Sequence, residues 1–264
     1  MKNIAPMIIL AAMCSVGGCA QAGKTLVNKV ADAAAKGVQT FKVSDAEVVA
    51  YADEYMKWKD ADNPLCTAGS YDREMRAVAA RLEKITSAIP AKLAKELNLR
   101  IRAYYVANVN AFSCANGDIR IFAGLMKCMT DDEVLAIIGH EVGHVANKDS
   151  KNAFVLAIRI AVLKDAVGSI GGKIGEQLTN SQLATIAEEL GKARYSQKQE
   201  INADAYGYSF LKKCGKDPAK MASALGVLLR LQEEAGSRPN NGYENLFASH
   251  PDLKKRIEKL NNKQ

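Results

Sequence analysis

The chain has 264 residues, of which 48% are hydrophobic and 25% are charged, a composition typical of globular domains and not of disordered or collagen-like chains. Its net charge of +7 comes from lysines and arginines scattered among 29 acidic residues, without a basic run interleaved with aromatic residues. The charge therefore indicates a solvated surface, and no nucleic-acid partner is expected.

The amino terminus has the pattern of a secretory signal. Lys2 precedes an apolar run at residues 7–13 that is too short to span a bilayer. The following Val16-Gly17-Gly18-Cys19 resembles a bacterial lipobox, which predicts a lipoprotein signal peptide at residues 1–18 and acylation of Cys19. Two or three acyl chains would anchor the protein firmly in a membrane, and Ala20 resembles an outer-membrane address. An ordinary cleaved signal with an incidental cysteine is the alternative.

The remaining cysteines bear on the compartment. An even number of cysteines in an oxidising compartment predicts up to two disulfides, whose pairing the sequence leaves open. Buried free thiols are the alternative. None has the C-x-x-C spacing typical of a zinc site made of cysteines. The residues concerned are Cys66, Cys114, Cys128 and Cys214.

The first part of the folded chain is predicted to be helical. Residues 19–43 are small and mixed in character, which predicts a lipidated tether before a domain at residues 44–264. Ser44 and Glu47 form a capping box that opens a helix, and apolar spacing predicts a second helix at residues 71–87.

A change of pattern follows from residue 101. Residues 101–123 are rich in β-branched and aromatic residues and contain the hairpin signal Asn116-Gly117. They predict one small antiparallel β-sheet directly before the next helix.

Helices again dominate the second half. Thr130 and Glu133 form a capping box for a helix at residues 131–147. Later helices are predicted at residues 153–167, 181–192 and 197–214. The segment at residues 168–175 is glycine-rich and favours a mobile loop, so we expect it or the residues before 44 to cover a cleft.

A metal-binding pattern lies inside the helix at residues 131–147. In His140-Glu141-Val142-Gly143-His144, the two histidines are four residues apart and share one face of the helix. They can bind one ion while Glu141 stands beside them as a base. The chain holds only 3 histidines, and the third is His250.

The helix at residues 197–214 offers a third ligand. A catalytic zinc ion held by two histidines needs one more protein ligand and an open position, and Glu200 can supply it. Asp204 lies one turn further on the same face and is expected to accept the outer N–H of a ligand histidine. A solvated acidic face is the alternative, but core-like Ala203, Ala205 and Tyr206 surround the pair.

Together with Asn110-Ala111-Phe112, Ser249-His250-Pro251 and Arg256, these two motifs resemble the zinc metallopeptidases of the CAAX-prenyl-protease and HtpX type. The resemblance covers nearly everything after residue 40. It implies an α+β fold, namely a mainly α-helical gluzincin-type metalloprotease domain with one small antiparallel β-sheet. It also implies one Zn²⁺ ion per chain. The chain departs from some members in lacking a tetratricopeptide segment and transmembrane helices.

The resemblance implies further roles. His250 would donate to the oxyanion and Arg256 would brace Asp204, although the residues alone allow His250 to begin a helix before Pro251. The strand from Asn110 through Ala111 to Phe112 would bind the backbone of an extended substrate at the sheet edge.

Combined with the lipobox, these features predict a zinc endopeptidase of the periplasm, anchored by lipid to the outer membrane. Its partners would be unfolded or misassembled envelope proteins, hydrolysed by a zinc-activated water with Glu141 as base. The main alternative is a non-catalytic, zinc-stabilised chaperone or assembly lipoprotein. A weaker alternative is an amidase acting on cell-wall peptides.

Overall fold

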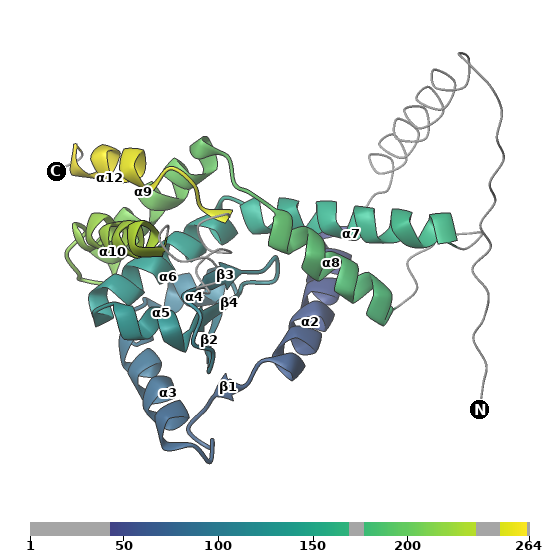
Figure 1. Cartoon of the computed structure of the whole chain (residues 1–264), viewed down its shortest axis with the longest axis horizontal. Helices are drawn as coiled ribbons and strands as arrows, with labels where there is room; N and C mark the ends of the chain where they lie inside the picture. Colours follow the sequence, from purple (N-terminus) through teal and green to yellow (C-terminus); the bar gives the residue numbers. More distant parts are fainter. Residues whose placement is uncertain (1–42, 169–176, 236–248, 263–264) are drawn as a thin grey trace. The chain divides into compact units, whose positions relative to one another are not determined.

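Helices make up most of the computed structural model, which describes residues 43–168, 177–235 and 249–262 (Figure 1). The described helices are α2 (Asp45–Asp62), α3 (Arg73–Thr86), α4 (Ala91–Glu96), α5 (Ala123–Cys128), α6 (Asp131–Ala146), α7 (Asp149–Gly168), α8 (Asn180–Lys192), α9 (Gln197–Lys213), α10 (Lys220–Ala235) and α12 (Leu253–Asn261). The described strands are β1 (Leu65–Cys66), β2 (Arg100–Tyr104), β3 (Ala111–Ser113) and β4 (Asp118–Phe122). The predicted α+β, mainly helical class is confirmed.

Several predictions fall on other parts of the chain. The signal peptide at residues 1–18, Cys19, nearly all of the tether and the glycine-rich segment after Gly168 lie outside the described residues. Every described residue belongs to one compact unit, Lys42–Gln264. Among the helices described, none is long and apolar enough to cross a membrane.

The described strands form one mixed sheet in the order β1, β2, β4, β3. The Asn116-Gly117 hairpin is confirmed, because β3 and β4 pair antiparallel on either side of it and Gly117 has a φ of +88°. However, β2 and β4 pair in parallel, which differs from the predicted antiparallel arrangement. After β2 the chain leaves room for one strand and forms β3 beyond it. It then turns back through the hairpin, and β4 fills the place between β2 and β3 and runs in the same direction as β2. β3 is left at an edge of the described sheet.

The predicted helices are confirmed, and side-chain caps fix several of their starts. Capping boxes join Ser44 to Glu47 at α2, Thr130 to Glu133 at α6, and Ser196 to Gln199 at α9. One start differs in a way that matters for the site. α7 begins at Asp149, four residues before the predicted start, because its apolar pattern begins only after a polar first turn.

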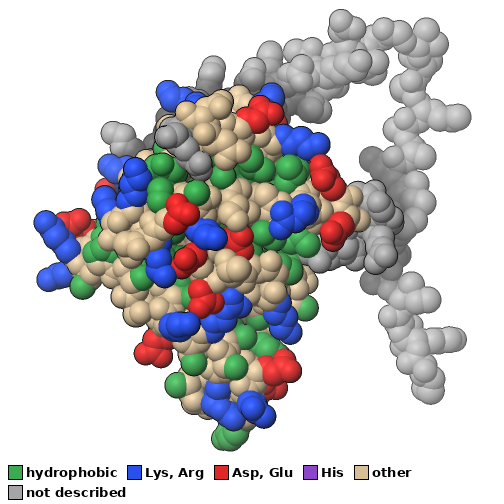
Figure 2. All heavy atoms as spheres, turned by 90° about the vertical axis from the view of Figure 1, so that its left-hand side faces the viewer, with side chains coloured by type: hydrophobic (Ala, Val, Ile, Leu, Met, Phe, Trp, Pro, Cys, Tyr) green, Lys and Arg blue, Asp and Glu red, His purple; other side chains and the backbone are tan. Residues whose placement is uncertain are grey.

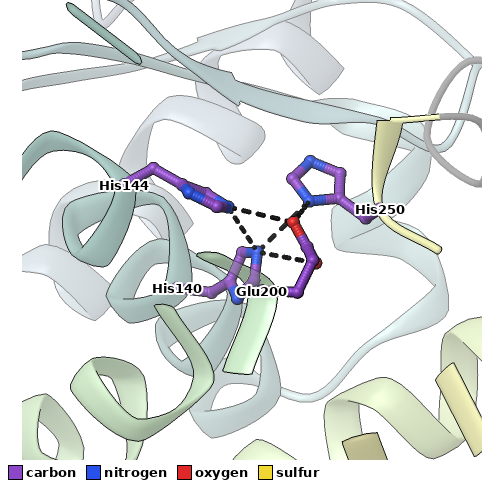
Figure 3. A group of neighbouring side chains, drawn as sticks. All are labelled: His140, His144, Glu200 and His250. Carbon is purple, nitrogen blue, oxygen red and sulfur yellow. Dashed lines mark hydrogen bonds and ion pairs between the residues drawn. The ribbon is translucent and has the colours of Figure 1, made fainter. Parts of the chain in front are cut away.

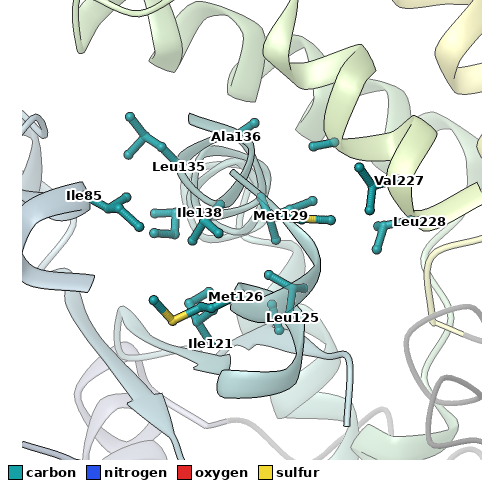
Figure 4. Packing of buried hydrophobic residues seen from close by; sticks show 14 of the residues in the cluster. Ile85, Ile121, Leu125, Met126, Met129, Leu135, Ala136, Ile138, Val227 and Leu228 are labelled. Carbon is teal, nitrogen blue, oxygen red and sulfur yellow. The ribbon is translucent and has the colours of Figure 1, made fainter. Parts of the chain in front are cut away.

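α6 lies in the middle of the hydrophobic core (Figure 4). Its Leu135 and Ile138 are buried together with Ile121 of β4, Met126 of α5 and Leu228 of α10. Burying each such side chain contributes roughly 1.5–3 kcal/mol. The helix that carries both motif histidines is therefore held rigidly on several sides.

On the face shown in Figure 2, acidic and basic side chains are interspersed, as expected for a solvated surface. The prediction of disulfides is wrong, because Cys66, Cys114, Cys128 and Cys214 are free thiols. Burial raises the pKa of Cys66 to about 11 and that of Cys114 to about 12, so both thiols stay protonated at neutral pH.

Candidate metal centre

The two motif histidines of α6 turn their Nε2 atoms toward each other (Figure 3). Nε2 of His140 lies 3.1 Å from Nε2 of His144. Both imidazoles are almost completely buried, because α6 is enclosed by the core at this point. The helical spacing has therefore placed two ring nitrogen atoms close together inside the protein.

α9 brings a carboxylate to the same point. α6 and α9 pack through small residues, Gly143 against Ala203, so the helices approach closely. Glu200 is fully buried and places Oε1 at 3.3 Å from Nε2 of His144 and Oε2 at 3.7 Å from Nε2 of His140. The residue predicted as third ligand thus lies beside the two histidines.

Hydrogen bonds on the far side of each ring set its tautomer. Nδ1 of His140 lies 2.9 Å from Oδ1 of Asp204, and Nδ1 of His144 lies 3.0 Å from Oδ2 of Asp149. Because an ionised carboxylate can only accept, each Nδ1 carries the proton and donates it. Each Nε2 then presents a lone pair. Two such lone pairs 3.1 Å apart, with the Glu200 carboxylate beside them, repel one another unless a metal ion or a proton lies between them.

The spacing agrees with zinc. In a tetrahedral site with zinc–nitrogen bonds of about 2.0–2.1 Å, two ligand atoms lie about 3.3 Å apart. The observed separations of 3.1, 3.3 and 3.7 Å among His140, His144 and Glu200 bracket this value. Oε2 of Glu200 also makes no hydrogen bond to the described residues, although it forms an ion pair with Arg256. The donor set fits a zinc ion.

His250 reaches the group from the segment before α12. Its Nδ1 lies 3.3 Å from Nε2 of His140 and 3.0 Å from Oε1 of Glu200. The ligand atoms of His140, His144, Glu200 and His250, which we call the metal group, all lie within 4.8 Å of one another. Nε2 of His250 lies 3.8 Å from Oε1 of Glu141. The structure therefore places His250 next to both the ligands and the expected base.

Arg256 of α12 holds the two acidic residues of α9. Its Nε and Nη2 atoms each donate to Asp204 at 2.7 Å, in a forked arrangement. Its Nη1 forms an ion pair with Glu200. Arg256 is only 2% exposed, so this guanidinium neutralises both carboxylates inside the protein. The contact with Asp204 is the predicted brace, whereas the contact with Glu200 was not foreseen.

Burial and charge set the pKa values of the group. Burial favours the neutral form of Glu200, but the nearby histidines lower its pKa well below the usual range. Burial also disfavours the imidazolium of His144, yet hydrogen bonds to Asp149 and Glu200 raise its pKa to about 9. Burial lowers the pKa of His140. The surroundings of His144 thus favour a positive charge, which a metal ion would supply.

Three neighbours of the group were missed by the sequence analysis. Asp149 supports His144, and Ser113 of β3 donates to Oε2 of Glu141 at 2.8 Å. The ring of Tyr195 stacks on His144 with centroids 3.9 Å apart. Asp149 follows His144 by five residues, and this short spacing is a sequence signal from which its contact with His144 could have been predicted. Nothing in the local sequence marks Ser113 or Tyr195, because they come from a strand and a loop that only the fold brings near.

A cavity of about 340 Å³ opens beside Glu141 and His250. It follows β3, so the three predicted substrate-binding residues, Asn110 to Phe112, line it. An apolar wall of the cavity comes from α2, α7, α8 and β4. The lining side chains there are Tyr55, Phe154, Ala187, Leu190 and Phe122.

Comparison with known proteins gives consistent matches. The model of peptidase family M48 matches residues 72–264, which include the whole metal group. The metalloprotease LoiP of Escherichia coli K12 is 33% identical over 225 residues, 85% of this chain and 83% of LoiP. The metalloprotease YcaL of the same organism is 28% identical over 262 residues, 98% of this chain and 97% of YcaL. The protease HtpX of Glaesserella parasuis serovar 5 is 31% identical over 193 residues, 61% of this chain and 66% of HtpX.

Proposed function

Since this chain belongs to peptidase family M48 and is a zinc metalloprotease, we propose that it is a periplasmic endopeptidase, lipid-anchored to the outer membrane, that degrades misfolded or misassembled envelope proteins. The observation that carries the proposal is the cavity that joins Glu141 and His250 to the edge strand β3 and to an apolar wall. A protease needs these three parts together, whereas a binding protein has no need of a base beside the metal.

In this proposal His140, His144 and Glu200 hold one zinc ion, and Asp204 fixes His140 in its ligating tautomer. When bound, zinc supplies Lewis acidity that lowers the pKa of a water molecule and polarises the scissile carbonyl. Glu141 accepts the proton of the attacking water and later delivers it to the leaving amine. Glu141 is only 2% exposed, so little bulk solvent competes for that proton.

His250 and Arg256 complete the catalytic set in this proposal. His250 lines the cavity, and an N–H of its ring can donate to the oxyanion that develops on the substrate carbonyl. Arg256 acts through its contacts with Asp204 and Glu200, whose carboxylates it keeps ionised and oriented. Arg256 therefore positions the ligands and does not itself touch the substrate.

The proposed substrate class follows from the cavity. An extended peptide can pair through its backbone with the edge of β3 that no described strand occupies, which requires no particular sequence. Its side chains would meet the apolar wall around Phe154 and Leu190. Folded proteins bury their apolar side chains and pair their backbones, so a chain that offers both is a misfolded or unassembled one. The periplasmic location and the lipid anchor are proposed from the pattern of residues 1–20.

Cleavage of unfolded casein tests the proposed activity. The wild-type protein loaded with zinc should cleave casein, and Glu141→Gln should lose at least 100-fold in rate while retaining the metal, because removing a general base costs about 10²–10⁴-fold. Glu83→Gln, on the exposed face of α3, is the matched control. Equal cleavage by Glu141→Gln would contradict the proposed base. Suppression of casein aggregation without cleavage by the wild-type protein would favour the chaperone alternative.

The location needs a separate test. Cells carrying the full chain should retain it in the outer-membrane fraction, and Cys19→Ala should remove it from that fraction, since acylation requires the cysteine thiol. A Cys14→Ala variant controls for loss of a cysteine in the same segment. An unchanged distribution of Cys19→Ala would contradict the proposed anchor.

A further inference from the structure

The two carboxylate oxygens of Glu141 have different neighbours. Oε2 accepts a hydrogen bond from Oγ of Ser113 at 2.8 Å. Oε1 faces the metal group, 3.8 Å from Nε2 of His250. One oxygen is thus held by the protein while the other is turned toward the place where the water would react.

Ser113 is itself held by a second hydroxyl. Oγ of Ser150 lies 2.8 Å from Oγ of Ser113. The single proton of Ser113 points to Glu141, so Ser150 must donate to Ser113 and not the reverse. Hydrogen bonds strengthen one another when each hydroxyl of a series donates to the next group, as Ser150 donates to Ser113 and Ser113 to Glu141.

The origin of this chain of hydroxyls lies in the turn between α6 and α7. Lys148 adopts a positive φ of 63°, which ends α6 and starts α7 at once. The first two residues of α7 then point back at the site: Asp149 supports the ligand His144, and Ser150 supports Ser113. One tight turn therefore connects the support of a ligand with the support of the base.

We propose that Ser113 is a positioning residue that fixes the rotamer of Glu141 and links the base to the substrate-binding strand. The inference rests on the proposed role of Glu141 as the general base. A glutamate side chain has several rotatable bonds, and a misplacement of about 1 Å at a reacting group can cost 100-fold in rate. Because Ser113 is the last residue of β3, a peptide paired with this strand also steadies the group that orients the base.

Kinetics of Ser113 variants with a peptide substrate test the inference. Ser113→Ala should lower kcat at least tenfold with KM and zinc content unchanged, since the hydroxyl acts on the base and not on binding. Ser113→Thr keeps the hydroxyl and should recover most of kcat. Ser150→Ala should lower kcat less than Ser113→Ala, because it acts through Ser113.

Ser223 of α10 provides a matched control, because its partner Glu133 lies on the same helix as Glu141. Its Oγ donates to Oε1 of Glu133, at the far end of α6 from the metal group. Ser223→Ala removes a serine–glutamate hydrogen bond of the same kind and should leave kcat unchanged. The inference is overturned if Ser113→Ala has normal kcat, if only its KM changes, or if Ser113→Thr is as slow as Ser113→Ala.

The result is separable from the proposed function. Activity retained in Glu141→Gln would refute the base itself, and with it both proposals. An inactive Glu141→Gln combined with a fully active Ser113→Ala would overturn only the positioning role. Zinc content and thermal unfolding of each variant show whether a loss comes from the site or from the fold.

Discussion

Gly143 of α6 packs so closely on Ala203 of α9 that a Cβ atom on the glycine would lie 2.9 Å from the alanine Cα atom. This contact sets the distance between the helix of the histidines and the helix of Glu200. Gly143→Ala should therefore lower the free energy of unfolding by about 1–3 kcal/mol and weaken zinc binding, since overpacking forces the helices apart. Urea unfolding and zinc competition titrations measure the two effects.

Gly226→Ala is the control for that substitution. Gly226 is also helical, but the nearest atom to an added Cβ is a side-chain nitrogen of Arg230 at 3.9 Å. This variant should be as stable as the wild type or more stable by about 0.5–1 kcal/mol, because alanine favours the helix. Equal stability of the two variants would contradict the tight α6–α9 contact.

Asp149→Asn should weaken zinc binding. The asparagine amide can no longer hold His144 in the Nδ1-protonated tautomer as a carboxylate does, and loss of such a partner costs about 10–100-fold in metal affinity. Asp132→Asn serves as the control, because Asp132 pairs with Lys216 at the surface, away from the metal group. Equal zinc affinity in both variants, measured by competition with a chromogenic chelator, would rule out the role of Asp149.

Arg256→Met should destabilise the fold strongly. It leaves the carboxylates of Asp204 and Glu200 buried without their cation, and breaking a buried pair in this way costs about 3–5 kcal/mol. Arg102→Met is the comparison, because Arg102 is largely exposed and lies 4.0 Å from Asp60. Its loss should cost at most about 1 kcal/mol. Chemical denaturation of the metal-free proteins compares the two, and similar losses would show that Arg256 is not a buried brace.

Removal of the metal should create a pH dependence of stability. Although burial disfavours its charged form, hydrogen bonds to Asp149 and Glu200 raise the pKa of His144 from 6.5 to about 9. A raised pKa stabilises the folded state fully below pH 6.5, and this stabilisation is lost as the pH rises through about 9. The metal-free protein should thus become less stable between these values. With zinc bound, His144 cannot take the proton, so the dependence should be weaker. Urea midpoints measured across this pH range, with and without chelator, test this prediction. It would be contradicted if the midpoint changed with pH equally in both series.

Ala187→Phe should narrow the apolar part of the cavity. Ala187 of α8 lines the cavity, so a phenyl ring there occupies the space of a substrate side chain. The ratio of kcat/KM for a leucine-containing peptide to that for its alanine analogue should fall about 10-fold or more, since apolar fit is worth about 1–3 kcal/mol. Ala184→Phe, exposed on the same helix, should leave the ratio unchanged. A ratio unaffected by Ala187→Phe would place the substrate elsewhere.

Short-range patterns in the sequence determined helices such as α6 and α9 and most of the metal group. The four-residue spacing of His140 and His144 puts both on one helix face wherever that helix lies, and capping boxes such as Thr130 with Glu133 mark where helices begin. The pair Glu200 and Asp204 was found in the same way, and the structure brings both to the histidines.

Long-range packing decided the rest. β2 pairs in parallel with β4 because the chain forms β3 on the side of β4 away from β2. No local sequence pattern indicates that arrangement. The same holds for Ser113 beside Glu141 and for Arg256 beside Glu200, which lie 28 and 56 positions apart in the chain. Spacing fixes which side chains share an element's face, whereas their partners across the core are chosen by how the elements pack. The sequence alone therefore determined a zinc site, and the tertiary structure decided what holds the proposed ligands and the proposed base in place.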